Sequence, residues 1–452
     1  MKKKTYHIIT IGCQMNKSDS ERIAAYLENI GFNWIDDYNK ADVVVTTTCG
    51  VRQTAEDSVY GLIPDIKKNN PQARIVLTGC LSNRGDVQKR LDKKVDVWLP
   101  ISELPSLDEK LGLKTLTEES EEKSSLTGYL NIQPRYESSF SAFVPIGNGC
   151  DNFCSYCVVP YARGRETYRP AKEILNEVRG LVKRGYKEIT LIAQNVNSYK
   201  DQSGGKNFKV YQFADLLKEV DNIPGDFWIR FATSHPKDMS FKLIKIIAAS
   251  KKICPQIHLP AQAGDNEVLR RMNRKYTREH YLELLKKIRD NLNNKKNNAK
   301  DDLWQEPVAI STDIIVGFPG ETKMQYKNTV KLFQEVGFDM AFIAQYSPRP
   351  GTASYNMVDD VLKEEKKRRF KELTELLRKS GFKNNQKYLN KIIRVLVEAK
   401  KSKYWFGKSA AGKIVRISHA EKKDGEEVIG GFVFVKIKKV ANFSMEGELV
   451  EI

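Results

Sequence analysis

Long apolar runs are missing from this sequence of 452 residues. No stretch approaches the ~20 apolar residues that a membrane-spanning helix needs, which excludes a protein anchored by such helices. The start, MKKKTYHIITIGC, has a basic head and ends in a cysteine, as a lipoprotein signal does. Its apolar stretch from Tyr6 to Ile11 is interrupted by His7 and is shorter than the ~7–15 residues that export requires. We therefore expect a cytoplasmic protein with no membrane contact.

Acidic residues are the scarcer charge. Lys and Arg number 75 against 57 Asp and Glu, which gives a formal net charge of +18. Residues 363–452 hold 23 basic and 12 acidic side chains, so +11 of this excess lies in the last 90 positions. This concentration favours a polyanionic partner, above all nucleic acid, over the alternative of solvated surface lysines.

Cysteines are few and odd in number, seven in all. Thiols stay reduced in the cytoplasm, so clustered cysteines there indicate metal binding or catalysis. The first hundred residues alternate strand and helix patterns in a βαβαβ order, with strands at 5–12, 41–48 and 73–79 and helices at 20–32 and 53–68. This order implies an open parallel sheet, whose carboxyl strand ends share one edge. Cys13, Cys49 and Cys80 each follow one of these strands, and three such residues could meet in one crevice.

The length suggests about three domains at ~150 residues each. EESEEKSSLTG, at 118–128, is polar and acidic and is typical of a mobile linker. We predict an amino-terminal domain over 1–117, a linker over 118–135, a central domain over 136–386 and a carboxy-terminal domain over 387–452.

Six strand–helix units follow one another in the central domain. Its predicted strands are 141–147, 188–194, 227–233, 256–260, 308–318 and 339–346. This repetition predicts an α/β fold with a partial (β/α)6 barrel, whose chemistry belongs at the strand carboxyl ends.

The carboxy-terminal domain has a different pattern. After a charged helix over 363–380, short strands are predicted at 392–399, 403–409, 413–419, 431–440 and 447–452. A small, basic, five-stranded β-barrel of this kind resembles an oligonucleotide-binding barrel. A barrel that only caps the central domain is the alternative.

The strongest chemical signal is the run Cys150-Asp-Asn-Phe-Cys154-Ser-Tyr-Cys157. Three thiolates in a loop directly after a predicted strand can bind three irons of a [4Fe–4S] cluster and leave the fourth iron open. Zinc is the rival ligand, but structural zinc takes four protein ligands, and no fourth Cys or His lies close in this segment.

This CxxxCxxC loop resembles the signature of the radical S-adenosylmethionine (SAM) superfamily. The resemblance extends through GCQMNKSDSERI (12–23), TTCGVRQTAE (47–56), QNVNSY (194–199), TDIIVGFPGET (312–322) and YSPRPGTAS (346–354). On these motifs the chain is identified as a member of the radical SAM methylthiotransferases, of the MiaB type that modifies tRNA, and its terminal barrel resembles a TRAM domain.

The resemblance implies two [4Fe–4S] clusters. The first, held by Cys150, Cys154 and Cys157, would bind SAM at its open iron and supply a 5′-deoxyadenosyl radical. The second, auxiliary cluster would be held by Cys13, Cys49 and Cys80. The seventh cysteine, Cys254, matches no family ligand and is interpreted as a buried thiol.

Further candidates carry weaker signals. Tyr156 resembles an aromatic residue that packs on the adenine of SAM, although a plain packing role is equally compatible. Arg163 and Arg165 could bind phosphate or carboxylate, or form ordinary ion pairs. Polar residues at strand ends are candidates for SAM or substrate contacts, namely Gln194, Asn195, Ser234 and Gln262. For His235 and His258 a structural role is the favoured interpretation.

The resemblance implies methylthiolation of C2 of isopentenyladenosine at position 37, beside the tRNA anticodon. One SAM would supply the radical and another the methyl group, with sulfur delivered through the auxiliary cluster. The expected partners are the anticodon loop, SAM, an electron donor and a source of sulfur or clusters, and we expect a monomer. Two alternatives stay open: a sister enzyme acting on threonylcarbamoyladenosine or on an aspartate of a ribosomal protein, and a non-catalytic RNA-binding protein with structural zinc.

Overall fold

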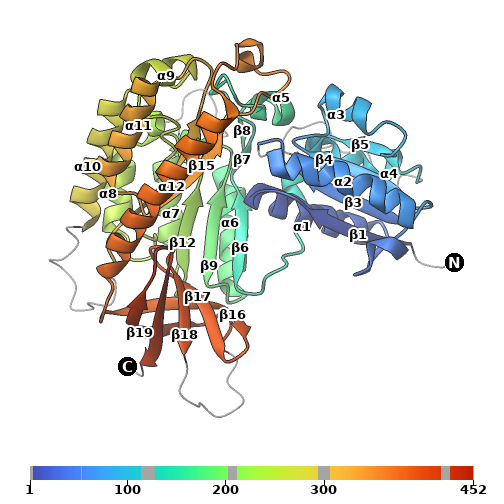
Figure 1. The fold of residues 1–452 in the computed structure, drawn as a ribbon. Helices are drawn as coiled ribbons and strands as arrows, with labels where there is room; N and C mark the ends of the chain where they lie inside the picture. The colour runs from blue at the N-terminus through green and yellow to red at the C-terminus, as the bar shows by residue number, and fades with distance from the viewer. Residues whose placement is uncertain are drawn as a thin grey trace.

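The structure is a computed structural model that describes residues 4–51, 53–113, 128–201, 211–293, 306–418 and 428–450. An amino-terminal sheet domain, a central partial barrel and a small closed barrel follow one another along the chain (Figure 1). Most of the predicted linker, residues 118–127, lies outside the described residues. Within the described ranges, no helix combines the length and apolar character needed to cross a membrane.

The amino-terminal domain is a five-stranded parallel sheet of order β2-β1-β3-β4-β5, as the βαβαβ pattern predicts. Its strands are β1 (Thr5–Thr10), β2 (Asn33–Trp34), β3 (Val43–Thr48), β4 (Arg74–Gly79) and β5 (Val97–Leu99). Its helices are α1 (Gln14–Asn29), α2 (Gln53–Asn69), α3 (Gly85–Arg90) and α4 (Leu107–Lys110). The central strand β3 is buried over its whole length because side chains pack on both faces: Val43 and Val45 toward Ile23 of α1, and Val44 toward Val59 of α2.

Helix α1 differs from the prediction, since it begins at Gln14 rather than near residue 20. Its first turns are polar and show no apolar periodicity, yet Asn16, Ser18, Asp19 and Arg22 are buried. Because these polar side chains face the central domain rather than solvent, the usual amphipathic signal of a helix is absent there.

The central domain is the predicted partial barrel. Strands β6 (Ser141–Pro145), β9 (Glu188–Ile192) and β12 (Trp228–Ala232) form one parallel sheet. Strands β13 (Gln256–His258), β14 (Ala309–Val316) and β15 (Met340–Gln345) form another. A parallel bridge between Ile229 and Ile253 joins β12 to the segment that leads into β13. The helices after the six strands are α6 (Ala171–Lys183), α7 (Phe213–Asp221), α8 (Phe241–Ala249), α10 (Arg278–Asn293), α11 (Lys323–Val336) and α12 (Lys363–Gln386).

The two faces of the central strands carry different side chains. Ile257, Ile310 and Ile314 belong to the large core beneath the helices. His258 and Asp313 alternate with them and therefore lie on the opposite, inner face of the barrel. Shorter elements complete the domain: β7 (Gly147–Asn148), α5 (Val159–Arg163), β8 (Thr167–Tyr168), β10 (Lys200–Asp201), β11 (Tyr211–Gln212) and α9 (Asn266–Arg271).

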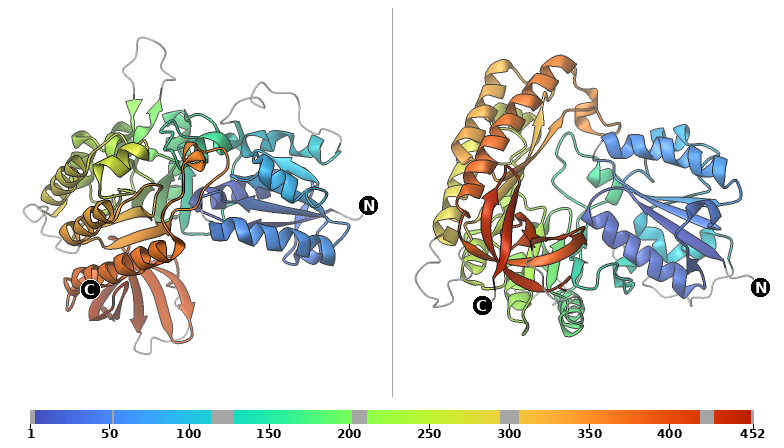
Figure 2. Two further views of the ribbon diagram at one scale, coloured as in Figure 1. Left: turned by 45° about the horizontal axis from the view of Figure 1, so that its top comes forward. Right: turned by 60° about the horizontal axis from the view of Figure 1, so that its bottom comes forward.

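The carboxy-terminal barrel is closed in the order β16-β17-β18-β20-β19. Its strands are β16 (Ile392–Lys401), β17 (Tyr404–Ser409), β18 (Ile414–Ser418), β19 (Phe432–Val440) and β20 (Ser444–Val450). Arg230 near the amino end of the central strands donates to the carbonyls of Ser409 and Ala410, both at 2.9 Å. The barrel thus packs on the end of the central domain away from α5, and the views of Figure 2 agree.

Cys254 lies in this interface. It is 1% exposed and clusters with Trp228, Leu396 and Ala410, where the barrel meets the central domain. Its position fits the interpretation as a buried thiol.

Candidate functional site

The first cysteine group lies in the loop between β7 and α5, at the carboxyl end of the first central strand. Gly149 precedes Cys150 with a φ of +82°, and a β-carbon there would stand 2.1 Å from the carbonyl oxygen of Arg165. Only glycine fits this close approach. The amide of Cys157 donates to the carbonyl of Cys154 at 3.0 Å, so the last two cysteines lie on one tight turn.

Contacts with α9 fix this loop. The Ser155 hydroxyl donates to the carbonyl of Arg271 at 2.9 Å, and the Ser155 amide to that of Met272 at 3.1 Å. Just beyond α9, the Arg274 guanidinium stands 3.4 Å from Cys154 Sγ and donates to the carbonyl of Pro260 at 3.0 Å. A buried cation therefore faces the sulfur of Cys154.

The second cysteine group follows three strands of the amino-terminal sheet. Cys13 lies after β1, Cys49 after β3 and Cys80 after β4. A β-carbon on Gly12 would stand 3.0 Å from Cβ of Cys49, and one on Gly50 would stand 3.2 Å from Cβ of Cys80. The three loops are thus stacked closely at one sheet edge, where a parallel sheet places its ligands.

The two cysteine groups face each other across the domain boundary. A β-carbon on Gly50 would also stand 3.2 Å from the side chain of Val158, the residue after Cys157. Burial raises the pKa of the Cys157 thiol, and the neighbouring thiols, Cys80 among them, raise it further. One junction between the two domains therefore brings both groups together.

The donor set fits iron–sulfur clusters on its chemistry. Within the described part of the chain, no three His, Cys, Asp or Glu side chains converge as ligands of a single metal ion would. A cubane cluster binds each thiolate through a different iron, so its ligands need not converge on one point. Burial also raises the pKa of the Cys150 thiol, so that cluster binding has to release protons.

Three of the predicted polar residues present buried atoms without a partner. Across the described residues, Gln194 Oε1, Asn195 Oδ1 and Ser234 Oγ lack a hydrogen-bond partner. All three follow the carboxyl ends of β9 and β12. Buried polar atoms are nearly always satisfied, so this gathering indicates a place for a polar ligand.

The backbone is strained in the same region. Phe153, Thr233 and Gln262 have φ values of 45°, 71° and 66°, which non-glycine residues rarely adopt. Each follows a different strand at the carboxyl end of the central barrel. Such strain collects at ligand sites because the surrounding structure has to impose it.

The remaining candidates take varied positions. Tyr156 is half-buried against the central core. Burial and the charges of Arg274 and Lys237 lower the pKa of His235 to about 2, which keeps its ring neutral. Arg165 forms an exposed ion pair with Asp151, the ordinary alternative weighed for it.

Arg163 and His258 also bind carboxylates of the chain itself. Arg163 is buried and binds Asp19 at 2.7 Å. His258 Nε2 stands 3.4 Å from Asp313 on the inner face of the barrel.

Three family models match the chain. The radical SAM superfamily matches residues 144–333, the uncharacterized protein family UPF0004 matches 5–100, and the TRAM domain matches 386–450. These ranges follow the three units of the fold and each contains the cysteines or strands described for it. The exact borders of the domains remain a prediction.

Similar proteins span the whole chain. The tRNA-2-methylthio-N(6)-dimethylallyladenosine synthase of Clostridium tetani is 40% identical, covering 99% of this chain and 97% of its own length. The synthase of the same name from Carboxydothermus hydrogenoformans is 39% identical and covers both chains completely. This chain belongs to the family of these synthases. Its identification as a radical SAM methylthiotransferase of the MiaB type is thereby confirmed.

Solved structures support the fold alone. The radical SAM methyltransferase TsrM of Kitasatospora setae superposes with a TM-score of 0.54 at 13% identity, covering 78% of this chain and 74% of its own. The α/β class with a radical SAM barrel is confirmed for this member of the synthase family.

Sequence reasoning missed several residues of this synthase-family site. Arg274 faces Cys154, and Arg349 reaches Glu56 across the domain boundary at 2.9 Å. Half-exposed Phe342 packs edge-on against His258, with ring centroids 5.8 Å apart. Arg349 and Phe342 lie in or near YSPRPGTAS and DMAFIAQY, so their motifs were visible although their contacts were not.

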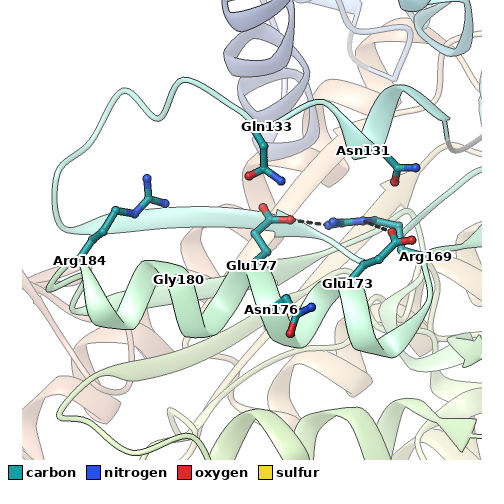
Figure 3. Close-up of a pocket in the computed structure, with 8 residues that line it drawn as sticks. All are labelled: Asn131, Gln133, Arg169, Glu173, Asn176, Glu177, Gly180 and Arg184. Carbon is teal, nitrogen blue, oxygen red and sulfur yellow. Dashed lines mark hydrogen bonds and ion pairs between the residues drawn. The ribbon is translucent and has the colours of Figure 1, made fainter.

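A cavity of about 400 Å³ lies elsewhere, between α6 and the segment that enters the central domain (Figure 3). The side chains that line it are polar or charged, and a 2.7 Å ion pair between Arg169 and Glu177 crosses it. None of the predicted site residues lines it.

Proposed function

We propose that this protein is a tRNA methylthiotransferase that converts N6-isopentenyladenosine at position 37 into its 2-methylthio derivative. The observation that carries the proposal is the junction of two cysteine groups at the carboxyl ends of two parallel sheets. Its chemistry agrees with the family, whose named members are tRNA-2-methylthio-N(6)-dimethylallyladenosine synthases.

Two [4Fe–4S] clusters and SAM are the cofactors of the proposal. Cys150, Cys154 and Cys157 would hold the cluster that binds SAM, and Cys13, Cys49 and Cys80 would hold the auxiliary cluster. When bound, these groups supply a hydrogen-abstracting radical, a methyl group and sulfur. An aromatic C–H bond has no acidic proton, so acid–base chemistry by side chains would not activate it.

The chain's own residues would bind and orient SAM and the nucleoside. The free polar atoms of Gln194, Asn195 and Ser234 would accept or donate to SAM or to the nucleoside at the barrel mouth. Tyr156, between two cluster cysteines, is a candidate for packing on adenine. Arg274 would hold Cys154 in place through a contact of 3.4 Å between its guanidinium and Sγ.

The macromolecular partner would be the tRNA anticodon loop, whose unstacked bases can be splayed into a protein site. The basic barrel would supply phosphate affinity. We place the protein in the cytoplasm as a monomer, served by an electron donor and a source of sulfur or clusters.

The decisive experiment is expression in a bacterial host that lacks its own methylthiotransferase, followed by mass spectrometry of tRNA nucleosides. We expect 2-methylthio-N6-isopentenyladenosine, and its loss in Cys154→Ala. Cys49→Ala should still cleave SAM but add no sulfur. Thiolated tRNA from Cys49→Ala would contradict the auxiliary-cluster assignment.

Two other outcomes separate the alternatives. If the protein carries both clusters and cleaves SAM but forms none of this nucleoside, its substrate is that of one of the sister enzymes. Anaerobic isolation should give about eight irons per chain. Zinc in place of iron, with no SAM cleavage, would support the non-catalytic alternative.

A further inference from the structure

Arg163 is a buried cation between the two cysteine groups. It ends α5, and its side chain is 2% exposed, as is that of Asp19 on α1. One guanidinium nitrogen donates to Asp19 Oδ2 at 2.7 Å and to Asn16 Oδ1 at 3.2 Å, and the other donates to Asn148 Oδ1 at 3.1 Å. The side chain therefore ties the loop of the first group to the helix that follows Cys13.

The contact with Asn16 leads directly to a cluster cysteine. Asn16 Oδ1 lies 3.7 Å from Cys13 Sγ and is the same atom that accepts from Arg163. The amide nitrogen of Asn16 donates to the carbonyl of Ile11 at 2.8 Å, which fixes its orientation. One hydrogen-bonded side chain thus separates the guanidinium from the thiol.

The charge of Arg163 acts on two cysteines of the second group. The guanidinium interacts electrostatically with Cys80 and Cys13 as well as with Asp19. Burying an ion pair is costly, and an apolar contact would tie two domains equally well. Asp19 Oδ1 has no hydrogen-bond partner among the described residues, so the pair is not optimised as a structural tie. These features call for a role of the charge itself.

We propose that Arg163 is a positioning residue for the auxiliary cluster, which compensates the cluster's negative charge and fixes the start of α1 against the loop of the first group. The inference rests on the proposed function, because it needs the cluster at Cys13, Cys49 and Cys80. Reduction adds a negative charge to a cluster, and hydrogen bonding and net charge set its potential. Arg163 therefore makes this cluster easier to reduce.

The test needs a protein that carries only the auxiliary cluster. In a Cys150→Ala, Cys154→Ala, Cys157→Ala background, the midpoint potential is measured by redox titration with electron paramagnetic resonance. Arg163→Gln removes the positive charge and should lower the midpoint potential. Asp19→Asn removes the neighbouring negative charge and should raise it.

Two more variants separate charge from packing. Arg163→Lys keeps the charge but loses the planar fork, so its midpoint potential should stay closer to that of the parent than in Arg163→Gln. Arg135→Gln is the matched control, because Arg135 binds Glu28 at the far end of α1 at 2.7 Å but is half exposed. It should leave the potential unchanged.

In the full enzyme, Arg163→Gln should still cleave SAM but form about 10–100-fold less methylthiolated nucleoside, the usual loss for a residue behind metal ligands. If the midpoint potential of the auxiliary cluster shifts in the same direction in Arg163→Gln and Asp19→Asn, or does not shift, the proposal is overturned. Equal loss of iron from Arg163→Gln and Asp19→Asn, with as much loss from Arg163→Lys, would make the pair a structural tie only. A parent protein without a second cluster would instead refute the proposed function.

Discussion

Replacing Arg349 by alanine should uncouple SAM cleavage from methylthiolation. Arg349 lies in the loop after β15, and its side chain crosses to the amino-terminal domain. Its guanidinium donates to Gln53 Oε1 at 2.8 Å, to Glu56 Oε2 at 2.9 Å and to the carbonyl of Val51 at 3.2 Å. Val51 stands two residues after Cys49, so the side chain of Arg349 holds the loop of Cys49 against the central domain.

The free-energy cost of Arg349→Ala depends on which ion pairs Glu56 keeps. Removing one partner of a buried ion pair costs about 3–5 kcal/mol when the other is left alone. Glu56 keeps Arg84, whose nitrogens lie 2.7 and 3.2 Å from its oxygens. The lost hydrogen bonds of a buried, 7% exposed cation should then cost about 2–3 kcal/mol. This energy corresponds to about a 30- to 150-fold smaller equilibrium constant for docking of the two domains.

The assay compares two products of one reaction, 5′-deoxyadenosine and 2-methylthio-N6-isopentenyladenosine. In Arg349→Ala the first should persist and the second should fall by more than tenfold, since only the second needs both cysteine groups in place. Iron content should stay at the parent level because no ligand is removed. Arg368→Ala is the control: it breaks ion pairs of a half-exposed residue on α12, which contribute at most about 1 kcal/mol.

An unchanged product ratio in Arg349→Ala, together with a lower unfolding temperature, would refute the reasoning. The side chain would then stabilise the protein without governing the approach of the two groups.

Three further predictions concern the loop, the domain boundary and the barrel. Gly149→Ala should abolish binding of the first cluster, losing about four irons per chain, because its β-carbon would overlap a carbonyl oxygen. Burial raises the pKa of Glu21 to about 7 from its ordinary 4.5, so folding stability should fall as pH rises from about 4.5 to 7. Glu21→Gln should remove this slope and raise the free energy of unfolding at pH 8 by up to about 3 kcal/mol. The β16–β17 hairpin should contribute to tRNA affinity through its exposed lysines Lys400, Lys401 and Lys403. Replacing any one of them by glutamine should reduce the slope of the logarithm of the binding constant against the logarithm of the salt concentration by about one.

Each of these has a direct check. Gly185→Ala is the control for the loop, since Gly185, outside the cysteine loop, has a φ of +89° and open space around it, and iron should be retained there. For Glu21→Gln, thermal unfolding at pH 4, below both pKa values, should show almost no gain; an equal gain at pH 4 and pH 8 would contradict the titration. Filter binding at several salt concentrations tests the hairpin, and a slope equal to that of the parent would exclude it from the RNA contact.

The fold was largely predictable because its strands are unusually clear. Runs such as VVVTTT in β3 are β-branched and buried on both faces, which is the pattern of a central parallel strand. The end of α12 was not predictable: it continues to Gln386, past Gly381, where a helix was expected to stop. A β-carbon at Gly381 would stand 2.5 Å from the carbonyl of Asn442, so this glycine serves a close approach to the terminal barrel rather than a helix end.

The candidate site was predictable only where chemistry follows position along the strand. Cysteines after parallel strands share an edge, so the meeting of Cys13, Cys49 and Cys80 followed from topology. The contacts of Arg163 and Arg349 did not, because their partners lie 144 and 293 residues away and nothing local marks them. A charged residue in a motif signals a contact, whereas its partner depends on how two domains dock.

The position of the terminal barrel on the central domain also separates the surface expected to bind tRNA phosphates from the site expected to select the nucleoside. The first cysteine group lies at the carboxyl ends of the central strands, whereas Arg230 and Glu306 bind the terminal barrel at the opposite end. The eight residues of β14 alone span roughly 26 Å at ~3.3 Å per residue. A barrel that binds phosphates at that distance cannot read the target base, and phosphate contacts carry no base identity. We therefore expect the choice of nucleoside to depend on the central strand ends, where Gln194, Asn195 and Ser234 hold polar atoms without partners among the described residues.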